Sequence, residues 1–313
     1  MNNPRYSQSS RPPAQGGDHA PSGPGSFLER LGAWRSASGA APQPHKPEPA
    51  RRGRRLIIPV TRKGGVGKSF FLASLADWYG EQKIPFIAMD SDWCNGSLTR
   101  FVPEARFVDV ASGNPAEEVH SALSECGIVA LDGLGPLQGY LFEWLQDCNF
   151  FRDTGEPVEL TYVLIVEEDK DSVFQAGESA RTLGDTGQWL VVRNLKTCPT
   201  TEIYNTSDAR QELLRLGAIE IQMDRVPWNL LLHVQRAGKT IGALAEDQGF
   251  PFLERQRMKS YLAKFYDQLG TAQSLLLPGG IILPPERQPE PPPPEPQPET
   301  QKKGRPRIAP DRV

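Results

Sequence analysis

The stretch Thr61-Arg62-Lys63-Gly64-Gly65-Val66-Gly67-Lys68-Ser69 decides the fold of this 313-residue chain. A short apolar run, residues 56–60, precedes it, and an amphipathic helix pattern follows it. Glycines let the backbone curl until successive N–H groups point inward, and the N-terminus of the next helix adds partial positive charge. The stretch therefore predicts a phosphate-binding loop, in which Lys68 reaches the β- and γ-phosphates and Ser69 ligates Mg²⁺.

The details of this loop point to one family. The usual pattern is G-x-x-x-x-G-K-[ST], but Arg62 stands at its first glycine and a second lysine, Lys63, follows. These residues resemble the deviant Walker A motif of the ParA/MinD family of P-loop ATPases. The resemblance implies that Lys63 contacts nucleotide across a homodimer interface. The nucleotide-binding residues are then predicted to be Lys63, Gly64, Gly65, Val66, Gly67, Lys68, Ser69 and Phe70. A glycine-rich turn in a basic loop is the alternative.

Carboxylates follow two predicted strands. Residues 85–89 form a short apolar run that delivers Asp90 and Asp92 to the carboxyl edge of the sheet, and residues 127–132 form an apolar strand that ends in Asp132. By the resemblance, Asp92 orients the attacking water, Asp90 supports the metal shell, and Asp132 is the Walker B carboxylate that holds Mg²⁺. The alternatives are a capped turn at Asp90–Asp92 and an incidental Asp132.

Two further positions are candidates for the nucleotide base. Asn194 ends a predicted strand over residues 189–194 and corresponds to the asparagine that recognises adenine in many family members. Pro227 belongs to a Val-Pro step, near which the backbone lines the adenine pocket in MinD-like domains. Without the resemblance, Asn194 would be an ordinary turn residue.

The remaining pattern predicts the architecture. Further strands are expected at 106–110, 160–166 and 218–223, and helices at 115–125, 139–148, 207–216 and 253–269. Another helix is expected to be capped by Asp171 and Ser172. Strands that alternate with helices from residue 56 to about 275 predict an α/β fold: one doubly wound domain with a mainly parallel sheet.

The two ends of the chain differ from its middle. Residues 1–55 are rich in Ser, Gly, Pro, Gln and Ala, and residues 284–298 hold nine prolines in fifteen positions. Neither end can bury enough apolar surface to offset chain entropy. We predict a disordered basic arm over 1–55, a folded domain over 56–278 and a disordered proline-rich tail over 279–313.

Charge indicates where nucleic acid would bind. Residues 56–283 carry 20 basic and 30 acidic side chains, whereas residues 1–55 carry nine basic and three acidic ones. Contacts with DNA are therefore expected from the extensions. Residues 51–55 either touch DNA phosphates or act as a solubilising flank. A Gly-Arg-Pro step in the tail resembles an AT-hook, a minor-groove binder, formed by Lys302, Lys303, Arg305 and Arg307.

Cysteine and apolar content restrict the remaining classes. The four cysteines lie far apart, which indicates reduced thiols rather than a metal cluster. No run of about 18 apolar residues is present, nor an apolar segment behind a charged N-terminus. We predict a cytoplasmic protein without membrane contact.

Together these features predict a Mg²⁺-dependent ATPase whose ATP-driven dimerisation acts as a switch. Within the family, the closing segment is most similar to TraL-type ATPases of plasmid conjugative transfer regions, so plasmid transfer or partition with an unidentified protein partner is implied. A nucleotide-binding adaptor with little hydrolysis is the first alternative, because Arg62 and both switch sequences are atypical. A metabolic ATP-dependent ligase would need further substrate-binding residues, and an iron–sulfur carrier would need paired cysteines.

Overall fold

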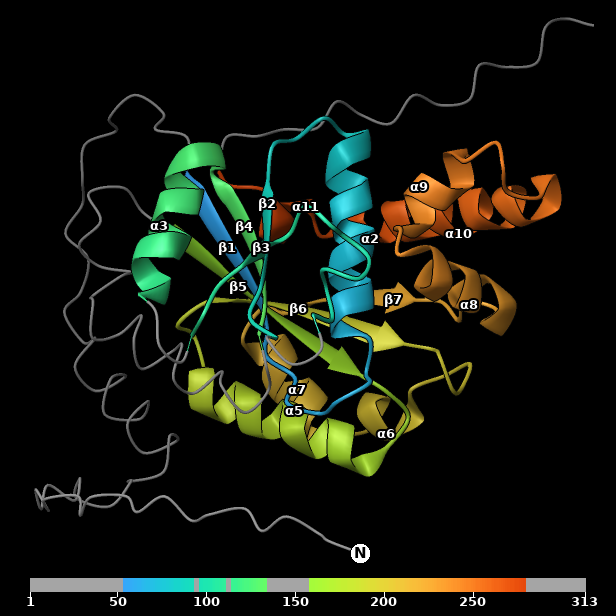
Figure 1. Cartoon of the computed structure of the whole chain (residues 1–313). Coiled ribbons are helices and arrows are strands. Elements are labelled where there is room, and N and C mark those ends of the chain that lie inside the picture. The colour runs from blue at the N-terminus through green and yellow to red at the C-terminus, as the bar shows by residue number, and fades with distance from the viewer. Residues whose placement is uncertain (1–52, 93–95, 111–113, 134–157, 280–313) are drawn as a thin grey trace, which may run out of the picture. The chain divides into compact units, whose positions relative to one another are not determined.

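The computed structural model describes residues 53–92, 96–110, 114–133 and 158–279 (Figure 1). The helix predicted over 139–148, most of the arm and tail, and the basic tail motif lie outside the described residues.

A seven-stranded parallel sheet forms the centre of the domain. The strand order is β3-β2-β4-β1-β5-β6-β7, so the chain builds first on one side of β1 and then on the other. Such a reversal opens a crevice at the carboxyl ends of the strands, where open α/β sheets bind ligands. The strands are β1 (Arg54–Pro59), β2 (Ile87–Asp90), β3 (Arg106–Phe107), β4 (Ile128–Asp132), β5 (Val158–Val166), β6 (Gln188–Asn194) and β7 (Ile219–Met223).

Helices cover both faces of this sheet (Figure 1). On one face, alternate residues of β1 and β5 pack with α3, α5, α6 and α7 in a single apolar cluster. On the other face α2, α10 and α11 contact β4, β7 and β6. These helices are α2 (Lys68–Glu81), α3 (Pro115–Cys126), α5 (Lys170–Leu183), α6 (Glu202–Asn205), α7 (Asp208–Arg215), α10 (Phe252–Thr271) and α11 (Gln273–Leu276).

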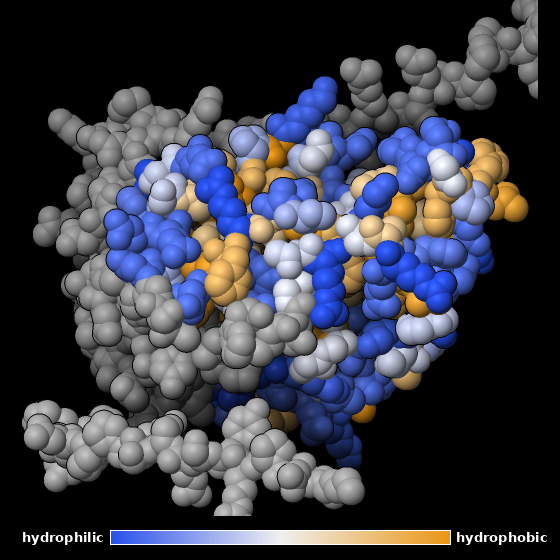
Figure 2. All heavy atoms as spheres, viewed as in Figure 1, coloured by the Kyte–Doolittle hydropathy of each residue, from blue (hydrophilic) through white to orange (hydrophobic). Residues whose placement is uncertain are grey.

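A second apolar cluster joins α10 to α8 (Trp228–Ala237) and α9 (Ile241–Glu246). At the start of α10, Phe252 and Leu253 are exposed by 62% and 73%. Figure 2 shows hydrophobic side chains at this end of α10, within an otherwise largely hydrophilic view.

The predicted α/β architecture is confirmed, and several local predictions are too. Pro115 occupies the first turn of α3, and the Ser207 hydroxyl caps α7 by accepting from the N–H of Arg210. The predicted cap of α5 is wrong: Asp169, not Asp171–Ser172, accepts from the N–H of Ser172. The helix predicted over 253–269 corresponds to α10, and a further short helix, α11, follows it.

One arginine of the basic cluster at residues 51–55, Arg55, differs from the prediction. Arg54 and Arg55 belong to β1, and the Arg55 side chain is buried. It therefore cannot contact DNA phosphates in this structure, because its guanidinium bonds to residues of β5, β6 and the C-terminal segment.

Candidate functional site

The predicted phosphate-binding loop connects β1 to α2 at the carboxyl edge of the sheet (Figure 1). Gly65 and Gly67 have φ angles of 75° and 98°, which L side chains rarely adopt. At Gly67 a Cβ atom would also lie 3.1 Å from Nδ2 of Asn194. The Thr61 hydroxyl donates to the carbonyl of Ile165 and accepts from its N–H, which ties the start of the loop to β5.

Lys68 and Ser69 begin α2. The Lys68 ammonium donates to the carbonyl of Lys63 at 3.1 Å, and it forms no ion pair with a carboxylate of the described residues. Burial lowers the pKa of Lys68, although Asp132 and Asp92 oppose this effect. A partly buried ammonium at the start of a helix, without a carboxylate partner in the described part of the chain, is the arrangement that an anionic ligand would complete.

Asp132 ends β4 beside Asp90, its partner in the register of β2 and β4. The Ser69 hydroxyl donates to Oδ2 of Asp132 at 2.5 Å, so the two predicted metal ligands are in contact. Burial raises the pKa of Asp132 to about 6; Asp90 and Asp92 add to the rise, while Ser69 and Lys68 oppose it.

The Asp90 carboxylate accepts hydrogen bonds from the loop that follows β2. Its Oδ1 accepts from the N–H of Asp92, and its Oδ2 accepts from the N–H groups of Leu98 and Thr99. Three of the roughly four acceptor positions of a carboxylate are thus taken, which favours a loop-positioning role over direct metal contact. Asp92 is buried and accepts a hydrogen bond from the Ser97 hydroxyl at 2.8 Å.

The Lys63 side chain contacts acidic residues between β5 and α5. Its ammonium pairs with Oδ2 of Asp169 at 2.7 Å, with Glu167 further away at 3.9 Å. Its N–H donates to Oε1 of Gln175 in α5. The bond to Asp169 raises the pKa of Lys63, and Lys63 therefore remains charged at neutral pH.

Asn194 braces the loop from β6. Its Nδ2 donates to the carbonyl of Val66 at 2.8 Å, and its Oδ1 accepts from the N–H of Lys196. The Lys196 ammonium donates to the carbonyl of Gly65. One amino hydrogen and one lone pair of Asn194 remain for a base, so its predicted contact with adenine stays a prediction.

These residues line a cleft of about 950 Å³, at the upper end of the range for small-molecule sites. It brings together Arg62, Gly64, Gly65, Gly67, Lys68, Ser69, Phe70, Asp92, Asp132 and Asn194. Lys63, Val66, Asp90 and Pro227 are not among its lining residues; Pro227 precedes α8, and its neighbours Val226 and Trp228 line the cleft instead.

Other lining residues were not predicted. Arg100 and Phe101 follow the Asp92 loop, and Trp228, 66% exposed, lies across the cleft on α8. The tryptophan directly after the Val-Pro step is the feature of the sequence that could have indicated this lining residue.

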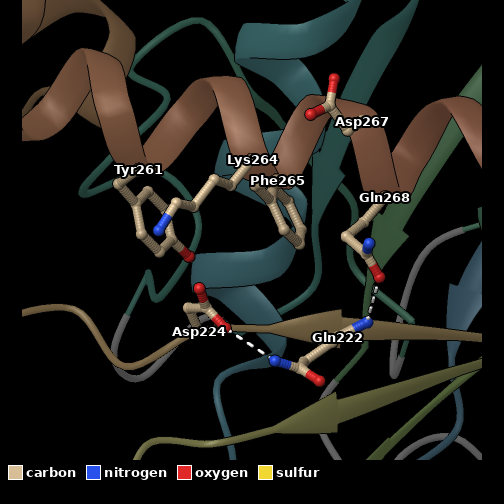
Figure 3. A pocket seen from close by; sticks show the side chains of 7 residues that line it. All are labelled: Gln222, Asp224, Tyr261, Lys264, Phe265, Asp267 and Gln268. Carbon is tan, nitrogen blue, oxygen red and sulfur yellow. Dashed lines mark hydrogen bonds between the residues drawn. The ribbon is translucent and has the colours of Figure 1, made fainter.

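Near one end of the cleft a smaller pocket, about 240 Å³, lies between β7 and α10 (Figure 3). Asp224 lines both.

The cleft fits a nucleoside triphosphate with Mg²⁺. A Cβ at Gly64 or Gly65 would meet no atom within 4 Å, which leaves open space above the loop. Among the described residues no three His, Cys, Asp or Glu side chains form a complete metal site. Mg²⁺ is usually held by one or two carboxylates together with substrate phosphates, and Asp132 with the Ser69 hydroxyl would be its protein ligands here.

The parallel sheet and the loop have the layout of a P-loop: a strand, a glycine-rich turn and a helix that begins with Lys68 and Ser69. No protein-family model and no curated protein matches the chain. Among solved structures the chain is similar to the MinD cell division protein of Aquifex aeolicus, with 13% identity, a TM-score of 0.41, and coverage of 69% of this chain and 97% of that one.

It is also similar to the MinC:MinD cell division protein complex of the same organism, with 13% identity, a TM-score of 0.39, and coverage of 69% of this chain and 96% of the matched chain. Similarity at this level carries no conclusion about activity or partners. In the described part of the chain, no helix is both long and apolar enough to cross a membrane.

Proposed function

We propose that the protein is a Mg²⁺-dependent ATPase of the ParA/MinD type that acts as a cytoplasmic switch. The observation that carries this proposal is the contact between Ser69 and Asp132 beside Lys68, at the start of α2. A hydroxyl, a strand-end carboxylate and a lysine at a helix N-terminus are the groups that P-loop enzymes use around Mg²⁺ and phosphate.

The chain's own residues would act as follows. Lys68 leaves the Lys63 carbonyl and binds the β- and γ-phosphate oxygens, while the loop N–H groups hold the phosphates. Ser69 and Asp132 would hold Mg²⁺, which neutralises charge on the transferred phosphoryl group. Asp92, held by Ser97, orients the attacking water, and Asp90 keeps the loop that carries Asp92 in place.

Dimerisation belongs to the same proposal. Lys63 lies at the rim of the loop and is partly exposed, so it can reach the phosphates of a second copy once it leaves Asp169. Two ATP-bound copies would then close face to face, and hydrolysis would reopen them. This ATP-dependent cycle would serve plasmid transfer or partition. A protein of that system would bind the dimer, and the basic extensions would hold DNA.

A second candidate is a nucleotide-binding adaptor with little hydrolysis. It is favoured by Arg62, which replaces the first glycine of the usual motif, is exposed and lines the cleft. An extra cation at the mouth of the loop strengthens phosphate binding without contributing a group that activates water.

The test separates binding from turnover. We expect Lys68→Ala to lose ATP binding, because it removes the partly buried cation of the cradle, and Asp92→Ala to bind ATP as a dimer that does not hydrolyse it. Calorimetric titration with Mg²⁺-ATP, phosphate release and sedimentation measure the three properties. Lys83→Ala, an exposed lysine that follows α2 at its far end from the loop, is the matched control. Unimpaired turnover in both site variants would reject the ATPase, and binding without turnover in the wild type would favour the adaptor.

A further inference from the structure

One end of the cleft, next to Asn194, offers polar groups besides the predicted base contact. Asn194, the predicted base contact, already bonds to Val66 and Lys196. The other residues that line this end are Lys196, Met223, Asp224 and Val226. Of these, Lys196 donates to the Gly65 carbonyl. Asp224 adds a carboxylate to the groups at this end.

Asp224 directly follows β7, at the carboxyl edge of the sheet. Gln222 donates to its Oδ1 at 2.9 Å, which fixes the carboxylate, while Oδ2 accepts no hydrogen bond from the described residues. Gln222 is itself held, because its N–H donates to Oε1 of Gln268 in α10 (Figure 3). The carboxylate is thus oriented and has one oxygen available.

Tyr261 of α10 supplies the second polar group. Its hydroxyl is buried and has no hydrogen-bond partner among the described residues, which is a costly state for a polar group. Figure 3 shows this hydroxyl pointing toward Asp224. Tyr261 lines the smaller pocket, which shares Asp224 with the cleft, and its ring lies 6.4 Å from that of Phe70, which lines the cleft.

We propose that Asp224 selects the base of the bound nucleotide by accepting a hydrogen bond from the exocyclic amino group of adenine. The Tyr261 hydroxyl, beside it, donates to the adjacent ring nitrogen N1. This proposal rests on the proposed function and names the specificity of the same site.

The chemistry follows from the two groups. An ionised carboxylate only accepts hydrogen bonds, whereas a tyrosine hydroxyl can also donate. Adenine presents an N–H donor next to a ring-nitrogen acceptor, which matches this pair. In inosine a carbonyl oxygen replaces the amino group, so a base lone pair faces the carboxylate. Such a mismatch leaves the carboxylate and the base oxygen without a hydrogen bond to each other, which discriminates against inosine.

The experiment compares the binding of Mg²⁺-ATP, Mg²⁺-ITP and the triphosphate of unsubstituted purine riboside to the full chain by calorimetry. Because a hydrogen bond to a charged group is lost, we expect both analogues to bind at least about tenfold more weakly than ATP. In Asp224→Asn, whose amide can donate to the inosine oxygen, the preference for ATP over ITP should fall to near parity. Asp267→Asn, in the same small pocket but away from the cleft, should leave the preference unchanged.

Equal binding of ATP and both analogues to the wild type would overturn the base assignment and leave the ATPase proposal standing. A preference that survives Asp224→Asn would overturn the role of Asp224. Absence of binding by all three nucleotides would overturn both proposals. Circular dichroism establishes that each variant is folded. If Asp224→Asn does not fold, Asp224→Glu, which keeps the charge but moves it by one methylene, replaces it: an unchanged preference for ATP over ITP would overturn the role of Asp224.

Discussion

The two lysines of the loop lie in different electrostatic surroundings. Burial lowers the pKa of Lys68, and the Asp169 carboxylate raises the pKa of Lys63. Lys68 therefore gains most from a phosphate, because it has no carboxylate partner among the described residues. Lys63 already has a partner, so any role across a dimer requires that its ion pair with Asp169 first opens.

Asp169→Asn tests this requirement at the scale of one residue. Asparagine keeps the side-chain oxygen that caps α5 but removes the charge that holds Lys63. The pair is partly exposed, so its contribution is modest, and we expect a few-fold tighter ATP-dependent dimer. Sedimentation equilibrium with a non-hydrolysable ATP analogue measures it. Asp171→Asn, two residues further on in α5, is the control; an equal effect of both variants would show that general charge, not the pair, is responsible.

At the scale of elements, α2 and α9 are joined through Asp77. Its Oδ2 accepts from the N–H of Gly242 at 2.8 Å, near the start of α9. A Cβ at Gly242 would lie 2.6 Å from Oδ1 of Asp77, so the two helices meet closely here. Burial raises the pKa of Asp77 to about 6, and Glu104 adds to it, although the bonds to Thr240 and Gly242 oppose the rise.

Asp77 therefore makes the stability of this junction depend on pH. Below about pH 4 both the folded and the unfolded chain carry a protonated Asp77, and the group contributes nothing. Between about pH 4 and 6 the folded state binds more protons, so stability falls as pH rises, and above pH 6 the full cost remains. Asp77→Asn should raise the free energy of unfolding by about 2 kcal/mol at pH 7.5 and by little at pH 4.

Urea unfolding at the two pH values measures this difference. Asp267→Asn, an exposed position on α10, serves as the control and should show no pH-dependent gain. A gain of equal size at both pH values would contradict a titration of Asp77.

The sequence predicts features that depend on neighbouring residues. It does not predict contacts between segments that lie far apart in the chain. The loop, Asp92 and Asp132 could be predicted because each depends on neighbours in sequence: a strand, a turn, a helix start. Asn194 was placed correctly at a strand end, but its bond to Val66 joins segments 128 residues apart. The sequence does not indicate that Asp224 and Tyr261 line one pocket, because they are 37 positions apart and belong to different elements.

Arg55 shows the same limit at the scale of the whole molecule. In the sequence it is one of several arginines beside a polar arm, a pattern typical of a solvated flank. In the structure it is buried, and its donors bond to Glu159, Thr161, Gln188 and the carbonyls of Ser274 and Leu277. The C-terminal segment of the domain is thereby held against β1 and β5.

Arg55→Met is expected to destabilise the domain by about 3 kcal/mol or more, because it leaves Glu159 and two backbone carbonyls without their donor. Urea unfolding at pH 7.5 measures the loss. Arg106→Met breaks an exposed pair with Glu125 instead and should change stability little. Equal midpoints for the two variants would show that the Arg55 contacts do not stabilise the fold.

The chain enters and leaves the described domain at neighbouring positions. Gly53 lies beside Gly279, since a Cβ at Gly53 would be 3.4 Å from the Gly279 nitrogen. Both residues are at the amino end of β1, whereas the phosphate-binding loop follows its carboxyl end. The chain therefore enters and leaves the described domain at the edge of the sheet opposite the phosphate-binding loop.

Deletion of residues 284–313 tests whether the tail holds DNA. Because the tail motif carries four cations over residues 302–307, we expect the deletion to weaken salt-sensitive retention on A·T-rich duplex DNA several-fold. Affinity for Mg²⁺-ATP should not change, since the deleted residues start beyond the segment bonded to Arg55. Retention at rising salt, measured by fluorescence anisotropy, reports the first property, and calorimetry reports the second. As a matched control, Lys302, Lys303, Arg305 and Arg307 changed to Gln should reproduce the deletion; retention that survives both changes would reject the tail as the DNA contact.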